Sequence, residues 1–339
     1  MKSLRMHSDR SLYFRELPMP GAPGPGQVLV RMAYASICGY DIMMLRGQAA
    51  NAPNGELGHE GSAIVEAVGP NVRQFRPGDA VAVNPYTTCG HCDACRGGHP
   101  AYCVNPGGRS DLMTEYLILD QDMVYRLPEG VSLRAGSLIE PLMMAMHAVR
   151  KAQIGYGKNV IILGCGAMGQ IILKLTRQHP VGKIVVVEPD ASKRNAAYRF
   201  GADVVLNPHA GNLLSEALML SDGKGYDAVI EASGDRASAQ NSINLVARGG
   251  SVVFFGLYGM EFNLELNLFN LYWKDASVSA VCVPHGQFPA ALRMAARLNL
   301  EEVITGMFPF EQAIEAFGEK EKGGHAKVML EFGKRESNL

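Results

Sequence analysis

The stretch that decides the fold is VIILGCGAMGQIILKLTRQ, residues 160–178. Its first four residues, 160–163, are all apolar, which is typical of a strand buried on both faces of a parallel sheet. A glycine-rich turn follows at once, and residues 170–178 have the pattern of a helix. Strand, tight turn and helix in this order predict the start of a βαβ unit, and therefore an α/β domain with a parallel sheet.

The turn reads G-x-G-x-x-G and consists of Gly164, Gly166 and Gly169, with Ala167 and Met168 before the last glycine. In this context the first glycine permits the turn, the second lets the backbone approach a pyrophosphate, and the third lets the helix pack on the strand. The helix N-terminus adds N–H donors and the positive end of its dipole. These five residues predict a dinucleotide site; the alternative is a glycine-rich helix start without a ligand.

Glu188 decides which dinucleotide we expect. It ends a second predicted strand, residues 183–188, about 20 residues after Gly166. A carboxylate at this point accepts hydrogen bonds from the adenine-ribose hydroxyls and repels a 2′-phosphate. NAD is therefore favoured over NADP, although Lys193 and Arg194 would suit a phosphate.

The predicted secondary structure differs before and after this unit. The first 130 residues read as strands and loops, whereas strands and helices alternate from about residue 159 to 255. The chain of 339 residues is long enough for about two domains. The predicted elements outside the alternating part are strands at 27–33, 59–68, 80–83 and 327–332 and helices at 133–151, 289–298 and 310–318.

Composition excludes several classes of protein. Lys plus Arg is 32 and Asp plus Glu is 33, so the net charge of -1 argues against binding to nucleic acid or to an anionic membrane. There is no run of about 18 apolar residues that would span a bilayer. Residues 1–10 are polar and charged, without the apolar core of a secretory signal, so we expect a cytoplasmic protein.

Four of the seven cysteines, Cys89, Cys92, Cys95 and Cys103, form the pattern C-x2-C-x2-C-x7-C. Thiolates two residues apart on a glycine-containing turn can converge on one centre, and four of them make a closed tetrahedral zinc site. Such a site has no open position, so its metal would be structural. Free thiols, a disulfide pair and an iron–sulfur cluster are the alternatives.

Four further residues are candidate ligands of a second metal: Cys38, His59, Glu60 and Glu140. A catalytic zinc needs three protein ligands and an open position. Each residue taken alone has another explanation, as a buried thiol, a hydrogen-bonded histidine or a charge on a helix surface. The sequence by itself does not place them together.

These motifs resemble those of the zinc-dependent medium-chain alcohol dehydrogenases, most of all the branch with sorbitol, butanediol and threonine dehydrogenases. The similarity covers nearly the whole chain, and the motifs stand in the family's order: Cys38-Gly39-Tyr40-Asp41, Gly58-His59-Glu60, Pro77-Gly78-Asp79, the four cysteines, Ile139-Glu140-Pro141 and the glycine turn. The resemblance implies a GroES-like β catalytic domain interrupted by a Rossmann domain. We expect the catalytic domain at 1–143 with a zinc lobe at 86–106, the NAD-binding domain at 144–284, and a return to the catalytic domain at 285–339.

The resemblance also implies roles for individual residues. Cys38, His59 and Glu60 match the residues of the catalytic zinc, and Glu140 matches a glutamate that holds the zinc-bound water or itself coordinates the metal. Which glutamate binds directly is left open. Asp41 matches a carboxylate that orients the zinc-bound histidine. With the four-cysteine zinc, we expect about two zinc ions per chain, bound NAD and a homodimer or homotetramer.

The sequence departs from the family where a proton should leave the substrate. Tyr40 stands where a serine or threonine is usual, and Met43 where a histidine is frequent. Either the Tyr40 phenol passes the proton, or it lines the pocket and water is the relay. Cys165 and Cys282 match no metal position, and we expect both to be packing thiols in apolar surroundings.

The implied reaction is oxidation of a secondary alcohol to a ketone by hydride transfer to NAD. A polyol, a cyclitol, a sugar acid or an amino alcohol would suit, and Arg109 either contacts such a substrate or is a solvated loop residue. Two alternatives remain. One is a zinc-independent NAD(P)H quinone or enone reductase of the same superfamily, which usually lacks the cysteine lobe and the pair Cys38 and His59. The other is a non-catalytic nucleotide-binding relative.

Overall fold

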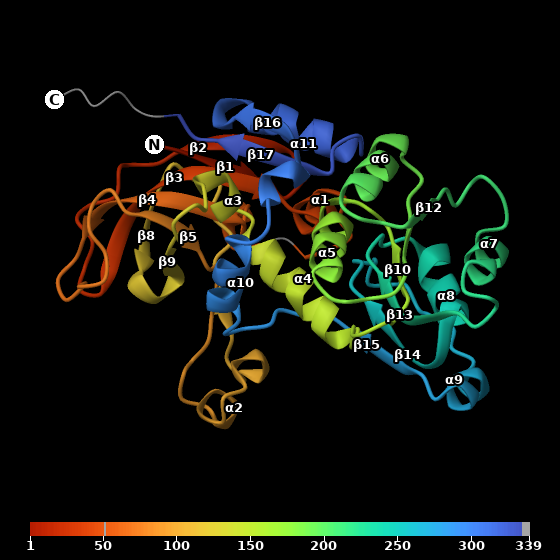
Figure 1. Ribbon diagram of the computed structural model, residues 1–339. Helices are drawn as coiled ribbons and strands as arrows, with labels where there is room; N and C mark the ends of the chain where they lie inside the picture. The colour runs from red at the N-terminus through yellow and green to blue at the C-terminus, as the bar shows by residue number, and fades with distance from the viewer. Residues whose placement is uncertain (51, 334–339) are drawn as a thin grey trace. The chain divides into compact units, whose positions relative to one another are not determined.

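The computed structural model describes residues 1–50 and 52–333, which fall into two compact units (Figure 1). The first unit contains Met1–Met143 and the segment that begins at Pro284, and the second contains Met144–Val283. The predicted α/β class is confirmed, with a β-rich first unit and a parallel sheet in the second. Among the described residues, no helix is long and apolar enough to cross a bilayer.

The second unit is built on a six-stranded parallel sheet in the order β12-β11-β10-β13-β14-β15. The first strand in the sequence, β10, therefore lies in the middle, and the strand order reverses between β10 and β13. Ligands bind at such a reversal, outside the carboxyl ends of the strands. The strands are β10 (Val160–Leu163), β11 (Ile184–Val187), β12 (Val204–Leu206), β13 (Tyr226–Glu231), β14 (Val246–Phe254) and β15 (Ser277–Ala280).

Helices cover both faces of this sheet, which explains the apolar strands. Every residue of β10 and β11 is buried. In Figure 1, α5 and α6 pack together, as do α7 and α8. The connections from β10 to β12 move along the sheet in one direction, and those from β12 to β15 move in the opposite direction. Because such connections are right-handed, the helices of the two pairs lie on opposite faces. The helices are α5 (Ala167–Arg177), α6 (Ala191–Arg199), α7 (Leu213–Met219), α8 (Arg236–Leu245) and α9 (Leu268–Lys274).

The first unit is built on a seven-stranded mixed sheet. Its order is β16-β17-β3-β4-β5-β9, and β8 pairs with β3 beside this path. Two small antiparallel pairs, β1-β2 and β6-β7, lie outside it. The strands are β1 (Lys2–Met6), β2 (Leu12–Glu16), β3 (Gln27–Ile37), β4 (Gly61–Val68), β5 (Ala80–Val83), β6 (Tyr86–Thr87), β7 (Gly107–Gly108), β8 (Tyr116–Asp120), β9 (Val124–Arg126), β16 (Ile304–Pro309) and β17 (Lys327–Glu331).

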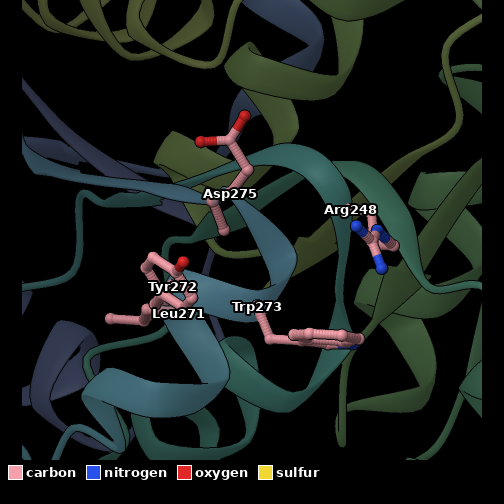
Figure 2. Close-up of a pocket in the computed structure, with 6 residues that line it drawn as sticks. Arg248, Leu271, Tyr272, Trp273 and Asp275 are labelled. Atoms are coloured by element: carbon pink, nitrogen blue, oxygen red, sulfur yellow. The ribbon is translucent and has the colours of Figure 1, made fainter.

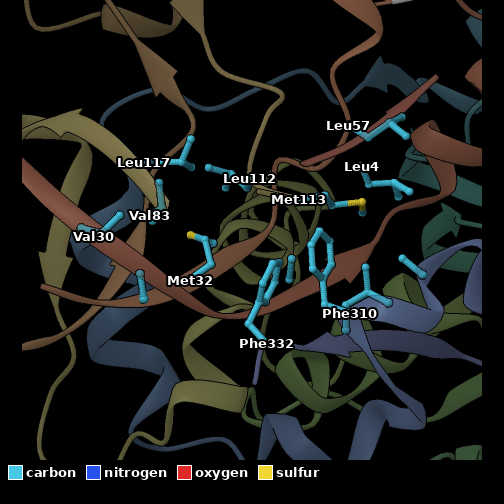
Figure 3. Packing of buried hydrophobic residues seen from close by; sticks show 14 of the residues in the cluster. Leu4, Val30, Met32, Leu57, Val83, Leu112, Met113, Leu117, Phe310 and Phe332 are labelled. Atoms are coloured by element: carbon cyan, nitrogen blue, oxygen red, sulfur yellow. The ribbon is translucent and has the colours of Figure 1, made fainter. Parts of the chain in front are cut away.

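The core of the first unit joins its two chain segments. Figure 3 shows Phe310 and Phe332, from the end of the chain, beside Leu4 and Met32 from its beginning. The two phenylalanine rings stack with centroids 4.2 Å apart. Strand β17 also pairs antiparallel with β3. Burial of these apolar side chains therefore holds the last segment against the first.

The predicted helix at 133–151 is wrong in one respect, because the chain breaks it. Helix α3 (Leu133–Gly136) ends at Ser137, whose hydroxyl donates to the carbonyl of Arg134, and α4 (Ile139–Lys151) starts afresh. The break places Glu140 in the first turn of α4. The remaining helices of this unit are α1 (Gly39–Leu45), α2 (Asp93–Arg96), α10 (Phe288–Ala295) and α11 (Ala313–Glu321), with 3-10 turns at Pro53–Gly55, Pro100–Tyr102, Gln121–Met123, Leu300–Val303 and Phe310–Gln312.

Candidate functional site

Three of the predicted ligands converge at one end of β3. Cys38 directly follows β3, while His59 and Glu60 directly precede β4. Antiparallel pairing of Ala35 with Gly61 brings the two strand ends side by side. One ligand atom of each of the three side chains lies within 4.8 Å of the others. A sulfur, an imidazole nitrogen and a carboxylate oxygen so close together form a donor set that suits zinc.

Asp41 organises the turn that carries Cys38. Its Oδ2 accepts a hydrogen bond of 2.8 Å from the backbone N–H of Cys38, and Cys38 Sγ accepts one of 3.5 Å from the N–H of Tyr40. The other oxygen, Oδ1, lies 3.8 Å from His59 Nδ1. Oδ1 is buried and has no hydrogen-bond partner among the described residues. A buried carboxylate oxygen facing a ring nitrogen suits a residue that orients a metal-binding histidine.

Glu60 is held by two residues that the sequence did not reveal. Lys327 Nζ donates to both carboxylate oxygens, at 2.9 and 2.7 Å, and the Ser36 hydroxyl donates to Oε2. Glu60 is only 1% exposed, so burial alone would raise its pKa, but Lys327 and His59 outweigh burial and lower it. Lys327 opens an apolar strand in the sequence. Nothing in the sequence shows that this strand lies beside β3.

Glu140 is also buried, at 4% exposed, but it lies outside the group of three ligands. The Tyr86 hydroxyl donates to its Oε1 at 2.7 Å. Burial, reinforced by the charge of Glu60, raises the pKa of Glu140 to about 7. Burial beside Glu140 raises the pKa of Tyr86 as well, so the phenol keeps its proton and donates it. Tyr86 was not recognised in the sequence, where an aromatic residue before a cysteine segment carries no distinctive signal.

Burial also changes the pKa values of the other candidate ligands. It raises the pKa of the Cys38 thiol, and the charge of Glu60 adds to this effect. For His59 burial alone would lower the pKa, but the neighbouring Cys38 and Asp41 raise it well above its usual value. Protons therefore compete for Cys38 and His59 more than for Glu60, whose pKa is lowered.

Tyr40 lies at the rim of the site. Its side chain is 39% exposed, and its ring meets that of His59 edge-on with centroids 6.4 Å apart. The ring is thus close to a candidate ligand and still open to solvent. This position is compatible with both roles considered above, a proton relay and a pocket wall.

The four-cysteine segment folds into a compact lobe of its own. The sulfur atoms of Cys89, Cys92, Cys95 and Cys103 lie within 4.8 Å of one another, and all four are free thiols. Backbone N–H groups donate to Cys103 Sγ from residues 89 and 105, at 3.3 and 3.4 Å. Four convergent sulfurs that accept backbone hydrogen bonds are typical of a structural zinc site.

Backbone hydrogen bonds also change the pKa values of the cysteines in this lobe. N–H groups of Cys95 and Val104 lower the pKa of Cys92 to about 6. The pKa of Cys103 is lowered in the same way, whereas burial raises that of Cys95 to about 11. The backbone around Cys92 and Cys103 therefore favours the thiolate form that a metal requires.

The glycine turn of the second unit has the geometry that its motif predicts. Gly164 adopts a φ of +95°, which disfavours any side chain. A Cβ on Gly169 would lie 2.0 Å from the carbonyl oxygen of Gly164, so the close packing of helix on strand needs a glycine. Gly166 instead faces open space, with nothing within 4 Å of an added Cβ. Open space before the N-terminus of α5 suits the pyrophosphate of a dinucleotide.

Glu188 follows β11 directly and turns back to this loop. Its carboxylate accepts hydrogen bonds from the backbone N–H of Cys165 at 2.7 Å and of Asp190 at 3.0 Å. The side chain of Arg194 donates to the backbone carbonyl of Glu188 at 3.1 Å. The acidic group thus lies against the glycine turn, while the nearby guanidinium is bonded to backbone carbonyls.

Two interpretations of single residues are tested by the structure, and one of them is corrected. Arg109 is a partly solvated loop residue, with its side chain 33% exposed, and its guanidinium bonds Asp111 twice, at 2.9 and 2.5 Å, and the carbonyl of Ile118 at 3.1 Å. Cys282 is exposed and does not pack in an apolar environment, because the segment after β15 leaves the sheet. Cys165 is buried, as expected of a packing thiol.

A surface pocket of about 540 Å³ lies elsewhere in the second unit, at α9. Figure 2 shows Trp273 on the same side of this pocket as Arg248, whose guanidinium lies 5.4 Å from the centre of the indole ring. Of the residues that line it, Asp275 alone has a side chain among the usual metal ligands.

Comparison with known families covers most of the chain. Residues 24–129 match the family model "Alcohol dehydrogenase GroES-like domain", and residues 167–297 match "Zinc-binding dehydrogenase". Human sorbitol dehydrogenase is 31% identical over 350 residues, which covers 99% of this chain and 97% of that protein.

Two solved structures extend the comparison to three dimensions. A zinc-dependent alcohol dehydrogenase from Streptococcus pneumonia, 27% identical, superposes with a TM-score of 0.88 over 99% of this chain and 100% of that one. A structure from Sinorhizobium meliloti described as a zinc-binding dehydrogenase bound to NADP is 26% identical, with a TM-score of 0.90 over 97% of this chain and 98% of that one.

Proposed function

The chain belongs to the zinc-dependent medium-chain alcohol dehydrogenases, and from that premise we propose that it oxidises a secondary alcohol to a ketone with NAD. The substrate class comprises polyols, cyclitols, sugar acids and amino alcohols. One observation carries the proposal: the ligand atoms of Cys38, His59 and Glu60 lie within 4.8 Å of one another. The sorbitol dehydrogenase among the relatives supports a polyol.

The donor set fits a catalytic zinc. Cys38 and His59 would hold the ion together with Glu60 or Glu140. A zinc ion bound there would supply a Lewis acid that lowers the pKa of an alcohol hydroxyl. Asp41 would orient His59 through its carboxylate, which faces the ring nitrogen Nδ1. Lys327 balances the buried charge of Glu60. The four-cysteine lobe would hold a second zinc, which has no open position and stabilises the fold.

NAD fits the second unit better than NADP. The carboxylate of Glu188 lies against the glycine turn through the N–H of Cys165. A negative group there attracts ribose hydroxyls and repels a 2′-phosphate. A solved relative of the same fold is bound to NADP, so the preference for NAD in this chain rests on Glu188.

The substrate proton needs a path to solvent, and Tyr40 is the side chain placed to provide it. Its ring lies edge-on to His59 and is partly exposed. A phenol in this position can accept the proton directly or through one water molecule. Tyr40 would thus take the role that a serine or threonine has in most of the family.

The exposed apolar side chains of one helix favour self-association of the chain. Helix α9 exposes the side chains of Leu268, Phe269, Tyr272 and Trp273, and monomers rarely expose large apolar patches. We expect a homodimer or homotetramer, and sedimentation of the purified protein tests this. The seven free cysteines favour a reducing compartment, the cytoplasm.

The decisive experiment is NAD reduction by the purified protein against a panel of secondary alcohols, with NADP as a parallel arm. Turnover with at least one polyol, cyclitol, sugar acid or amino alcohol is expected, with a higher kcat/KM for NAD. Reduction of quinones or enones by NADPH without alcohol oxidation would instead support a zinc-independent reductase. Nucleotide binding without any turnover would support a non-catalytic relative.

A further inference from the structure

Tyr86 connects the two candidate metal sites of the first unit. It lies in β6, shortly before Cys89, and β6 pairs with β7, which follows Cys103. The hairpin β6-β7 is therefore the base of the four-cysteine lobe. From this base the Tyr86 hydroxyl donates to Glu140 Oε1 at 2.7 Å.

The ring of Tyr86 is fixed by its neighbours. His285 meets it edge-on, with centroids 5.7 Å apart and an interplanar angle of 76°. The backbone N–H of Tyr86 donates to Asn84 Oδ1 at 3.2 Å. A Cβ on Gly286, the residue after His285, would lie 3.0 Å from Pro100, which belongs to the lobe. The lobe and the segment of His285 and Gly286 therefore fix the position of the phenol.

One hydrogen bond of this kind has a large influence on a buried carboxylate. Glu140 is in the first turn of α4 and its side chain can adopt several rotamers. The bond from Tyr86 holds Oε1, and Glu140 lies close enough to the site for its charge to help raise the pKa of His59. Partners of this kind typically change metal affinity by about 10–100-fold.

We propose that Tyr86 is a positioning residue through which the four-cysteine lobe fixes Glu140 at the catalytic metal site. The inference rests on the proposed function, because it requires a metal at Cys38 and His59. When the lobe is closed by its own metal, the hairpin β6-β7 is rigid and Glu140 is held in place. When the lobe is open, Tyr86 loses its fixed position and the catalytic metal is bound less tightly.

The test compares Tyr86→Phe with Tyr102→Phe. Both remove one phenolic oxygen, but Tyr102 is 76% exposed on the same lobe. The metal-free protein is titrated with Co²⁺ alone, and the visible spectrum and affinity of each site are recorded. Tyr86→Phe should weaken Co²⁺ binding at the Cys38 site by about 10–100-fold and shift its spectrum. Tyr102→Phe should match the wild type, and Tyr86→Phe should stay folded, with a somewhat lower thermal unfolding temperature because a buried carboxylate loses a hydrogen-bond donor.

Cys95→Ser tests the link to the lobe. It should weaken Co²⁺ binding at the Cys38 site in the wild-type background, and add little to the effect of Tyr86→Phe, because both changes act through one contact. If Cys95→Ser fails to fold, the comparison of Tyr86→Phe with Tyr102→Phe still decides. Unchanged affinity and spectrum in Tyr86→Phe would overturn the inference alone. A wild-type protein that binds no metal at Cys38 would overturn the proposed function as well.

Discussion

The two candidate metal sites of the first unit are built in opposite ways. The four-cysteine lobe takes all its ligands from one short segment, and its chemistry is visible in the spacing of the cysteines. The site at Cys38 and His59 is assembled from the end of β3, the start of β4 and the first turn of α4. Lys327, from the last strand, supports it. Four ligands from one short segment can complete a tetrahedral site without the rest of the fold. A site with ligands from distant segments forms only in the folded protein, and with three protein ligands it would keep one coordination position for substrate.

The largest expected effect separates the two sites by function. Cys38→Ser should leave a folded protein whose kcat is at least about 10³-fold lower, because a bound metal contributes several kcal/mol to the reaction. Cys95→Ser should lower the thermal unfolding temperature or disrupt assembly. With excess zinc its kcat should stay within about tenfold of the wild type, because the lobe does not touch substrate.

Steady-state kinetics and thermal unfolding of the two variants check this division. Cys92→Ser provides a second substitution within the lobe and should behave like Cys95→Ser. If the variants at Cys38 and Cys95 lost only activity and kept equal thermal stability, the division of roles would be wrong.

The next largest effect is expected for Tyr40, at the rim of the site of Cys38 and His59. Tyr40→Phe keeps the ring against His59 and deletes the hydroxyl. Removing a positioned acid–base group typically costs about 10²–10⁴-fold in rate, and water can replace part of the loss, so kcat for alcohol oxidation should fall at least roughly tenfold at neutral pH. Part of the loss should be recovered at high pH. An unchanged kcat with an altered KM would mean that Tyr40 only shapes the pocket.

Acid should remove the metal from the two sites at different pH values. Metal binding displaces protons, so a ligand with a raised pKa loses its metal at a higher pH. At the Cys38 site the pKa of Cys38 and of His59 is raised and that of Glu140 is raised to about 7, while only that of Glu60 is lowered. In the lobe the pKa of Cys92 is lowered to about 6 and that of Cys103 is lowered, while only that of Cys95 is raised, to about 11. As the pH is lowered from about 8 to about 5, the Cys38 site should empty first.

Dialysis at a series of pH values, followed by metal analysis, measures this order. Activity should disappear with the first metal released, while thermal stability should fall with the second. Release of the lobe metal at a higher pH than the metal of the Cys38 site would contradict the prediction that ligands with raised pKa values lose their metal first.

The smallest expected effect lies in the second unit. Glu188→Ser removes the negative charge beside the glycine turn, so the ratio of kcat/KM for NAD to that for NADP should fall by about tenfold or more, which corresponds to about 1.4 kcal/mol. Asp190→Ser is the matched control, since Asp190 caps α6 through Lys193 N–H. Equal use of the two cofactors by the wild-type protein would contradict the interpretation of Glu188.

The sequence could predict what short segments determine. The strand and glycine turn at 160–169 predicted the parallel sheet because each glycine has a local steric reason, and β10 has the predicted limits. The convergence of the four cysteines follows equally from their spacing. The resemblance to a family was needed for Cys38 and His59, because strand pairing between β3 and β4 brings them together.

Other features could not be predicted because they depend on tertiary pairing. Lys327 and Tyr86 reach their glutamates from strands whose neighbours the sequence does not reveal. The exposed position of Cys282 was missed because the apolar residues around it suggested burial. The ion pair of Arg109 with Asp111, only two residues away, was not predicted, although Arg109 is partly exposed as a loop residue.

The central claim is that one chain holds two metal sites with separate roles, and metal content tests it most directly. Purified wild-type protein, loaded with zinc and freed of excess by gel filtration, should contain about two zinc ions per chain. Cys38→Ser and Cys95→Ser should each contain about one, the first inactive but as stable as the wild type. A wild-type content of about one zinc ion, lost in Cys95→Ser and unchanged in Cys38→Ser, would contradict the account.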